Sequence, residues 1–420
     1  MSILIKNATL IYPGEKDHNK SRDVLISNGK IEKIASKIDA PSAKVIEGNK
    51  LCISPGWIDI GTLGGEPGYE YREDFKSLSN AAAAGGYTGL ALFPNTNPPI
   101  DDKSSLQFVI NATQSLIVDF YPIGAISKNT EGKEITEMMD MSHNGAVAFS
   151  DGKKSVKLSG LLLRALQYAK SINGLIIHHP DDESLSNDNQ IHEGAVSTSL
   201  GLKGSPSIAE VLTLERDVLL SQYADTHILL HNLSSSQSIE RLMQMENEKV
   251  YASVGYLNLC KSDEALSGFD VQYKASPPLR SEKDRKALVK AVKNGTIQII
   301  NSNHVPLEEE QKKKEFVYAE LGAIGLQTCF AALRTFVPKI NVSDLVECVA
   351  INPRKILGLE KVSMKAGETA DITIFDLDKK WTFDQSNNQS KSKNSPFLGQ
   401  EFEANVVGII NGRKSHFNNY

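Results

Sequence analysis

The sequence lacks the features of a membrane, secreted or nucleic-acid-binding protein. Its 420 residues contain no apolar run of the ~18 residues that a membrane-spanning helix needs. The first residues show no basic segment followed by a long apolar stretch, which argues against a signal peptide. There is no basic tract, and the formal net charge of −5 argues against nucleic acid as a partner. We therefore expect a cytoplasmic protein that binds neither membranes nor nucleic acid.

Cysteine pairs and glycine-rich loops are also missing. The four cysteines are scattered without a Cys-x-x-Cys motif, so we expect them to be reduced core residues. No Gly-x-Gly-x-x-Gly follows any apolar run, which disfavours a doubly wound dinucleotide-binding sheet, the structural alternative for an α/β chain. Hydrophobic residues at 40% and charged residues at 23% are ordinary values, and the chain is long enough for a large ordered core.

Both ends of the chain have the apolar pattern of β-strands. Asn28-Gly29 and Asn411-Gly412 lie next to such segments and suit tight hairpin turns. Strand segments at both ends of an α/β body indicate that the two ends together form a small β-sandwich domain. We therefore assign residues 1–54 and 359–420 to this domain and residues 55–358 to the body.

The body alternates short apolar runs with helix-like segments. Apolar residues at helical spacing predict a helix over Ser159–Lys170, and a Ser-x-x-Glu capping box predicts another that begins at Ser207. A third predicted helix begins at Ser281 and stops at Gly295. Eight strands that alternate with helices over ~300 residues are typical of a (β/α)8 TIM barrel. The eight runs are Trp57–Ile60, Thr88–Phe93, Val118–Ile123, Gly145–Phe149, Gly174–Ile177, Thr226–Leu230, Val250–Val254 and Thr296–Ile300.

Polar residues follow most of these runs, at the end of the barrel where chemistry is placed. Taken singly, each has a structural interpretation, because a lone histidine after a strand is more often hydrogen-bonded structure and Ser-Asp-Gly is good turn chemistry. Strand alternation allows only one of His178 and His179 to face a central pocket. The polar residues at these positions are Asp59, Asn95, Asn97, Asp151, His178, His179, His231, Asn232, Asn303 and His304.

Longer strings in the body resemble the dihydroorotase family of the amidohydrolase superfamily, in its bacterial long form. The resemblance extends from about residue 3 to about residue 415. Pro94–Pro98 (PNTNP) and Pro277–Arg280 (PPLR) favour dihydroorotase over allantoinase or dihydropyrimidinase, which share the fold. The other strings are Pro55–Asp59, Glu66–Gly68, Ala84–Thr88, Ile324–Thr328, Asn352–Arg354 and Gly367–Asp376. The resemblance implies a role in pyrimidine biosynthesis.

The resemblance also implies a metal centre. One or two zinc ions convert water to hydroxide and polarise the amide carbonyl, and an aspartate after strand eight moves the proton. The first ligand string, Asp-x-His-x-His, has Gly61 and Leu63 in place of its histidines. An ungapped alignment puts Asn232 at a third ligand position, which His231 would occupy only with a one-residue shift. Asn303, which cannot accept a proton as a carboxylate does, stands at the aspartate position.

Five further positions complete the comparison with the family. Asp151 and His179 match metal-ligand positions, and these two are the remnant of the centre. In the substrate pocket, Asn95 is kept. Gly65 replaces an arginine that grips the substrate carboxylate, and Leu307 replaces a histidine. Two ligands are too few, since a catalytic zinc normally takes three protein ligands plus water.

We therefore predict no bound zinc or other cofactor and no enzymatic activity, that is, a dihydroorotase-like pseudoenzyme. The intact scaffold predicts a homo-oligomer that acts as a non-catalytic partner of aspartate carbamoyltransferase. Two alternatives remain open. In the first, the chain is an active zinc-dependent dihydroorotase or other cyclic amidohydrolase that uses Asp151 and His179 with unmatched donors such as His178, His231 or His304. In the second, it is a small-molecule binding module that uses Asn95 and the emptied pocket.

Overall fold

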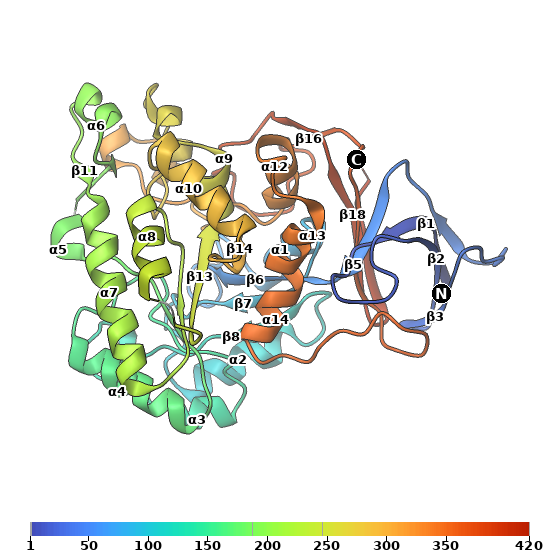
Figure 1. The fold of residues 1–420 in the computed structure, drawn as a ribbon, viewed down its shortest axis with the longest axis horizontal. Coiled ribbons are helices and arrows are strands. Elements are labelled where there is room, and N and C mark those ends of the chain that lie inside the picture. The colour runs from blue at the N-terminus through green and yellow to red at the C-terminus, as the bar shows by residue number, and fades with distance from the viewer. Residues whose placement is uncertain (1, 187, 246, 420) are drawn as a thin grey trace.

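Both ends of the chain meet in one sheet in the computed structural model, which describes residues 2–186, 188–245 and 247–419. The sheet has eight strands in the order β19-β18-β15-β5-β1-β2-β3, with β4 paired to β1. Its N-terminal strands lie at one end of the molecule, beside the barrel (Figure 1). The strands are β1 (Ser2–Leu10), β2 (Ser21–Ser27), β3 (Lys30–Ala35), β4 (Lys44–Ile46), β5 (Leu51–Pro55), β15 (Asp371–Asp376), β18 (Asn405–Asn411) and β19 (Lys414–Phe417).

The hairpin between β2 and β3 shows why these strands can be recognised in the sequence. Asn28 and Gly29 have φ of 51° and 79°, and a type I′ turn requires positive φ at both central residues. Inward side chains such as Ile5, Val24 and Ile372 pack into a core of their own. The prediction that both chain ends build one β domain is confirmed, while the boundary positions that we gave for the domains stay predictions.

The body is a ring of parallel strands, and the predicted (β/α)8 barrel is confirmed. The fourth predicted strand is reduced to Phe149, which bridges Gly124 after β8 and Ile176 in β9. The amide of Leu63 donates to the carbonyl of His304 at 3.1 Å and joins the last strand end to the first. The strands are β6 (Trp57–Thr62), β7 (Tyr87–Leu92), β8 (Asp119–Pro122), β9 (Ile176–His178), β12 (Ile228–Leu230), β13 (Val250–Gly255) and β14 (Ile299–Asn301).

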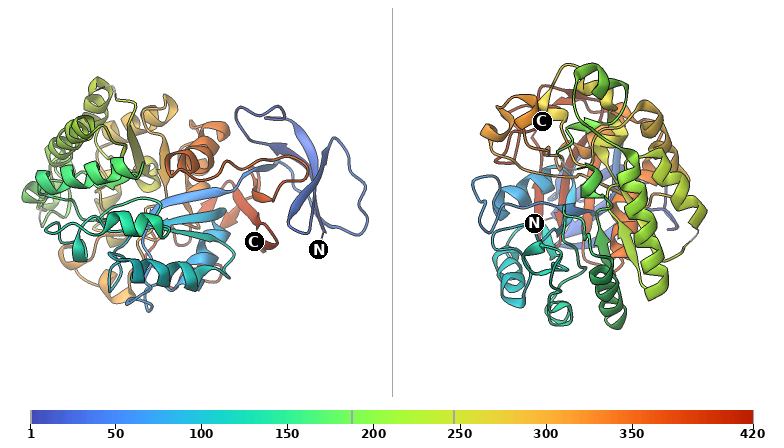
Figure 2. Two further views of the ribbon diagram at one scale, coloured as in Figure 1. Left: turned by 90° about the horizontal axis from the view of Figure 1, so that it is seen from below. Right: turned by 90° about the vertical axis from the view of Figure 1, so that its left-hand side faces the viewer.

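Helices cover the outside of the ring (Figures 1 and 2). The helices of the barrel are α1 (Phe75–Ala84), α2 (Lys103–Thr113), α3 (Met138–His143), α4 (Ser159–Ser171), α7 (Ser207–Ala224), α8 (Ser236–Met245), α9 (Tyr256–Cys260), α10 (Glu282–Lys293), α12 (Cys329–Phe336), α13 (Val342–Val346) and α14 (Asn352–Ile356). Shorter elements are α5 (Glu183–Ser186), β10 (Ile191–His192), α6 (Ala195–Leu200), β11 (Gly204–Ser205), α11 (Glu309–Lys312), β16 (Trp381–Thr382) and β17 (Glu401–Phe402). Within the described ranges, no helix is long and apolar enough to cross a membrane.

The helix starts confirm one predicted cap and correct another. Ser281 caps α10 through its side chain. Ser207 is already the first residue of α7, and the residue before it makes no side-chain cap, so the predicted capping box is wrong. Glu210 turns inward instead and accepts hydrogen bonds from the amides of Ser234 and Ser235, both at 3.0 Å. Its carboxylate therefore joins α7 to the loop after β12.

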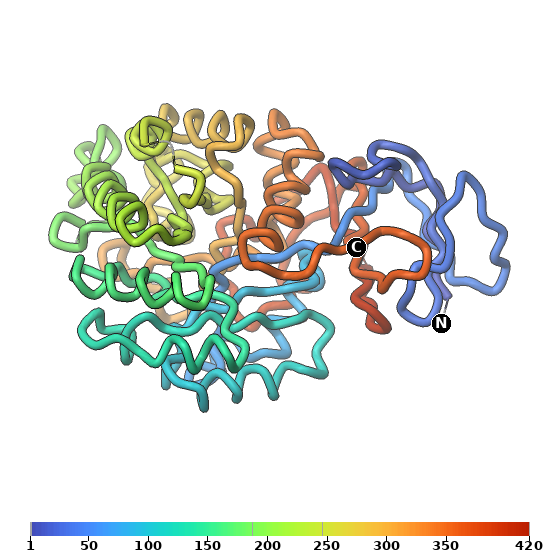
Figure 3. Tube along the Cα trace, turned by 60° about the horizontal axis from the view of Figure 1, so that its bottom comes forward, coloured from blue at the N-terminus to red at the C-terminus, as the bar shows by residue number. Residues whose placement is uncertain are grey.

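Between β15 and β18 the chain leaves the sheet and returns to the barrel before it re-enters the sheet (Figure 3). Asn394 donates from Nδ2 to the carbonyl of Val305 at 2.8 Å, and its own carbonyl accepts from the amide of Ile324 at 2.9 Å. Ser390 donates to the carboxylate of Glu73. This segment therefore covers one side of the barrel end at which the polar residues gather.

Candidate functional site

Three asparagine side chains form a hydrogen-bonded chain at the carboxyl end of the barrel. Asn301 Nδ2 donates to Asn232 Oδ1 at 2.7 Å, and Asn232 Nδ2 donates to Asn303 Oδ1 at 3.0 Å. Asn232 and Asn303 have φ of 61° and 45°, a left-handed region that asparagine tolerates better than most residues. Two positions at which the family has a metal ligand and a carboxylate are therefore in direct contact here, as neutral amides.

A lysine that the sequence motifs did not reveal joins this chain of amides. The ammonium of Lys153 donates to Asn303 Oδ1, and the residue is half-buried. Desolvation lowers the pKa of Lys153 to about 8, and the charge of Asp59 partly opposes the shift. Among the residues that the structure describes, no carboxylate lies within ion-pair distance of this ammonium. Its place in the sequence, two residues after Asp151 at a strand end, is the signal that could have found it.

Asn95 holds the loop that carries Lys153. Its Nδ2 donates to the carbonyl of Asp151 at 3.0 Å, and its Oδ1 accepts from the amide of Lys153 at 3.1 Å. The Asp151 carboxylate is occupied by Ser127, whose amide and hydroxyl donate to it at 2.9 and 2.5 Å. Burial raises the pKa of Asp151, and the hydrogen bonds from Ser127 oppose the shift. Both residues therefore fix the shape of the mouth, and each oxygen of the Asp151 carboxylate already accepts a hydrogen bond.

The adjacent histidines separate as strand alternation predicts. His178 is buried, with Nδ1 2.6 Å from the carboxylate of Asp217 and Nε2 accepting from the amide of Val156 at 2.8 Å. Both ring nitrogens are thus used inside the scaffold. His178 is a structural residue, which removes it from the donors that the zinc-dependent alternative would use.

His179 is buried beside a small cavity. It lines a cavity of about 70 Å³ whose wall includes Arg280, and its Nδ1 lies 3.3 Å from the carbonyl oxygen of His231. Desolvation lowers the pKa of His179; the charge of Asp181 opposes the shift, and that of Lys153 adds to it. The ring is therefore neutral near pH 7, and Nδ1 is the ring nitrogen that contacts the His231 carbonyl.

His231 fills the space beside Gly61. Its ring packs edge-on against Phe93 with centroids 4.9 Å apart, and its Nδ1 lies 3.2 Å from Ser253 Oγ. Its Nε2 is buried and has no hydrogen-bond partner among the described atoms. A Cβ at Gly61, where φ is 87°, would lie 2.8 Å from this Nε2. A histidine at position 61 and the present ring of His231 therefore exclude one another. Desolvation, with the charges of Lys153 and His179, lowers the pKa of His231 well below its usual range.

At the other positions that differ from the family pattern, neighbouring residues of this chain fill the space. A Cβ at Gly65 would collide with the carbonyl oxygens of Tyr69 and Glu73, so no arginine fits there. Leu63 packs against the apolar residues at the barrel end, and Leu307 is buried. The groups that the family resemblance implies for gripping a substrate carboxylate at positions 65 and 307 thus have no counterpart.

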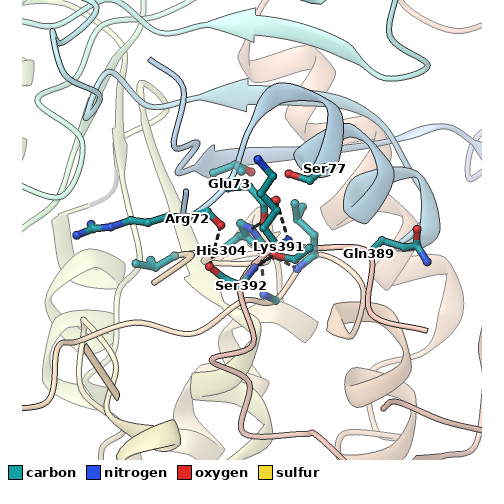
Figure 4. Close-up of polar contacts among 12 residues, drawn as sticks. Arg72, Glu73, Ser77, His304, Gln389, Lys391 and Ser392 are labelled. Carbon is teal, nitrogen blue, oxygen red and sulfur yellow. Dashed lines mark hydrogen bonds and ion pairs between the residues drawn. The ribbon is translucent and has the colours of Figure 1, made fainter. Parts of the chain in front are cut away.

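His304 belongs to a second polar cluster (Figure 4). Its Nδ1 accepts from the amide of Gly325 at 3.2 Å, and its Nε2 lies 3.5 Å from the carboxylate of Glu73. Glu73 is fully buried and accepts from the hydroxyl of Ser390 and, at 3.1 Å, from the amide of Lys391. We refer to Glu73, His304, Ser390 and Lys391 as the Glu73 cluster. Although Asn303 and His304 are neighbours in sequence, they serve different clusters.

The donors at the mouth do not fit the zinc centre that the family resemblance implies. In the part of the chain that the structure describes, no group of three His, Cys, Asp or Glu side chains is placed to hold a metal ion. The Asp151 carboxylate is bound to Ser127, and Asn232 is bound to Asn303. We therefore derive no chemical step through a metal. That the chain takes no cofactor remains a prediction.

The architecture defines the class of fold. The L-hydantoinase (dihydropyrimidinase) from Arthrobacter aurescens matches 98% of this chain and 95% of its own with a TM-score of 0.85 and 24% identity. The dihydropyrimidinase from Brevibacillus agri matches 100% and 95% with a TM-score of 0.82 and 21% identity. At these identities the similarity shows the fold, a TIM barrel joined to a β domain that both chain ends form.

The sequence relatives define the family. Residues 50–238 match the model of the dihydro-orotase-like family. The dihydroorotase from Acetivibrio thermocellus is 36% identical over 417 residues, which cover 98% of each chain. The dihydroorotase from Caldicellulosiruptor saccharolyticus is 37% identical over 421 residues, 98% of this chain and 97% of that protein. This chain belongs to the dihydroorotase family.

The prediction that the chain is not an enzyme is contradicted by these relatives, which carry an enzyme's name over nearly the full length of the chain. The physical weakness of the prediction is that it counted missing metal ligands. A count of zinc ligands tests only the zinc-dependent mechanism, and it ignores other polar groups at the barrel mouth. Lys153 and the neutral imidazole of His179 are such groups.

Proposed function

We propose that this chain is a cyclic amidohydrolase of pyrimidine biosynthesis that interconverts dihydroorotate and carbamoyl aspartate. Full-length membership of the dihydroorotase family supports the choice of reaction. One geometric observation carries the proposal for this site: the imidazole of His179 lines the cavity at the barrel mouth. Ring opening adds water across the amide C–N bond, so it needs a group that takes a proton from water and returns it to the leaving nitrogen.

His179 fits that role. Its lowered pKa keeps the imidazole neutral at about pH 7, the form that accepts a proton. Because Nδ1 faces the carbonyl of His231, Nε2 is the atom available to water. In the proposed step, water gives a proton to Nε2 while its oxygen bonds to the ring carbonyl carbon. The C–N bond then breaks, and the proton passes from Nε2 to the leaving nitrogen.

The test is an assay of ring opening and ring closure with purified protein of measured metal content. We expect turnover in the parent protein and a ~10²–10⁴-fold loss in His179→Gln, the range that general acid–base groups contribute. His143→Gln, on the exposed surface of α3, is the matched control and should keep full activity. If a chelator abolished the activity and zinc restored it, the reaction would depend on a metal centre and not on His179 as the general base. Absence of turnover in both directions would remove the proposal.

We propose separately that the chain binds aspartate carbamoyltransferase. An exposed apolar stripe along α7 supports a protein-binding surface: Ile208, Leu212, Leu219 and Tyr223 are 45%, 47%, 58% and 77% exposed. Residues at this spacing share one helix face. The test is co-expression with the transferase and size-exclusion chromatography, using Leu219→Glu with Tyr223→Ser, and Leu398→Glu as the control. Co-elution that only the α7 variant loses would support binding at this stripe. Self-association through the same stripe would instead support the predicted homo-oligomer.

A further inference from the structure

Among the residues that the structure describes, no carboxylate forms an ion pair with the Lys153 ammonium at the barrel mouth. The Lys153 ammonium contacts the neutral amide oxygen of Asn303. Two carboxylates at the mouth are bound by serines: Ser127 binds Asp151, and Ser302 binds Asp59 through its amide and hydroxyl at 2.6 and 2.7 Å. A partly desolvated charge without an opposite partner is unfavourable. The site therefore favours the arrival of an anion.

The amide chain fixes which atom meets the ammonium. Asn303 Oδ1 accepts from both Lys153 and Asn232, while Asn303 Nδ2 donates to the carbonyl of Ser276 at 3.1 Å. Asn232 is oriented in turn by Asn301. An asparagine at 303 therefore positions the ammonium without neutralising it. An aspartate at the same place would form an internal ion pair and cancel the charge.

The charge of the buried Asp59 acts on Lys153, but among the described residues it forms no ion pair with the ammonium. His179 and His231 lie close enough for the Lys153 charge to act on both rings, and neither side chain can carry a negative charge near pH 7. The Lys153 side chain is half-buried, and its ammonium is partly desolvated. Position 65 cannot supply a second cation, because the backbone of Tyr69 and Glu73 fills the space around it.

We propose that Lys153 is the counter-charge for the carboxylate of a small carboxylated ligand bound at the barrel mouth. The choice of a carboxylated cyclic ureide as that ligand rests on the proposed function. Asn303 acts as the neutral positioning residue for Lys153. Lys153 is thus a specificity residue, which separates carboxylated rings from uncharged rings of the same shape.

The experiment compares binding of dihydroorotate with binding of dihydrouracil, the same ring without the carboxylate, by calorimetry at about pH 7. The parent protein should prefer dihydroorotate by at least ~10-fold. Lys153→Met should lose this preference, because the cation is removed. Asn303→Asp should also lose it, because an internal carboxylate takes the place of the ligand. Circular dichroism and melting curves establish that each variant is folded.

Lys154→Met is the matched control. Lys154 is the next residue, is exposed, and donates to Thr130 Oγ1 at 3.0 Å, away from the amide chain. This variant should keep the full preference for dihydroorotate. Inorganic phosphate serves as a competitor, and it should displace dihydroorotate only weakly. Phosphate binding of equal strength with the same dependence on Lys153 would overturn the carboxylate assignment in favour of a general anion site.

The outcomes separate this inference from the proposed hydrolysis. Binding that depends on Lys153 in a protein without turnover would support the counter-charge and remove the catalytic proposal. Turnover with an unchanged KM in folded Lys153→Met would overturn the counter-charge and leave the catalytic proposal standing. Retention of the full carboxylate preference in both Lys153→Met and Asn303→Asp would also overturn it.

Discussion

Two charges at the same end of the barrel differ in where their partners come from. Glu73 is fully buried, and its carboxylate receives Ser390 and Lys391 from the distant C-terminal segment, with His304 beside it (Figure 4). Lys153 receives one neutral amide oxygen, from Asn303. The first charge is satisfied within the chain and holds the fold together. The second, the Lys153 ammonium, is available to an anionic ligand.

The difference follows from the energetics of buried groups. A buried charge stabilises a fold only where hydrogen bonds replace its lost hydration, and removal of such a partner leaves the remaining donors unsatisfied. Glu73 meets that condition, because Ser390 and Lys391 donate hydrogen bonds to its carboxylate. Both donors lie more than 300 positions away in the chain, so the carboxylate also joins distant segments. Variants of the two residues should therefore act in different ways, on stability in one case and on ligand binding in the other.

The largest expected effect is on Glu73. Glu73→Ala removes the acceptor of Ser390 and Lys391 and leaves a void, so the free energy of unfolding should fall by ~3 kcal/mol. The measurement is chemical denaturation followed by circular dichroism. Glu70→Ala, at an exposed carboxylate nearby, is the control and should stay within ~0.5 kcal/mol. A tolerated Glu73→Ala would remove the structural half of the comparison.

A second prediction concerns the space at the mouth. Gly61→His should lower the free energy of unfolding by ~2 kcal/mol, because φ is 87° and a Cβ would press on the His231 ring. Adding His231→Ala should recover part of this loss, since the ring is then gone. The readout is the melting temperature of the single and double variants. Equal stability of Gly61→His and the parent would show that the pocket can rearrange to accept the family's histidine.

Much of the fold could be predicted from local pattern. Seven of the eight apolar runs became named strands, because a buried parallel strand needs a continuous apolar run. The fourth run shrank to the bridge at Phe149, which pattern alone does not reveal. The capping motif at Ser207 misled because Glu210 had a stronger use, in binding the amides of Ser234 and Ser235. Tertiary contacts determine the orientation of the Glu210 side chain, and a local sequence pattern does not contain them.

The site was predictable in position and less so in chemistry. Strand ends indicated where polar residues would gather, and Asn232 and Asn303 do meet there. The sequence could not show that His231 occupies the space at Gly61, because this depends on a ring orientation across the barrel. Nor could it show that Lys153 reaches Asn303, a contact between residues 150 positions apart.

A third prediction uses a lysine that the chain does satisfy. Lys312 is buried and donates to the carbonyls of Val271, Lys274 and Glu320 at 2.9, 3.2 and 2.8 Å. Burial, with the charge of Lys274, lowers the pKa of Lys312 to about 7. Lys312→Met should lower the free energy of unfolding by ~1–2 kcal/mol at about pH 7, because three carbonyls lose their donor.

The pH dependence of that variant follows from linkage. Between about pH 7 and the ordinary lysine pKa near 10.5, the unfolded chain binds more protons at Lys312 than the folded chain, so this residue makes stability rise with pH. The difference between the parent and Lys312→Met should therefore widen between pH ~7 and ~9. Denaturation curves at both values give the measurement. A constant difference would mean that the three carbonyls hold the ammonium charged in the fold.

The smallest expected effect on stability is that of Lys153→Met. Asn303 Oδ1 keeps its hydrogen bond from Asn232 when the ammonium is removed, and a cation without a counter-charge leaves a partly desolvated site. We therefore expect the free energy of unfolding to change by no more than ~1 kcal/mol, in either direction. Denaturation of Lys153→Met beside the exposed control Lys154→Met measures this. A fall as large as that of Glu73→Ala would mean that Lys153 is as structural as Glu73, and the contrast between the two charges would disappear.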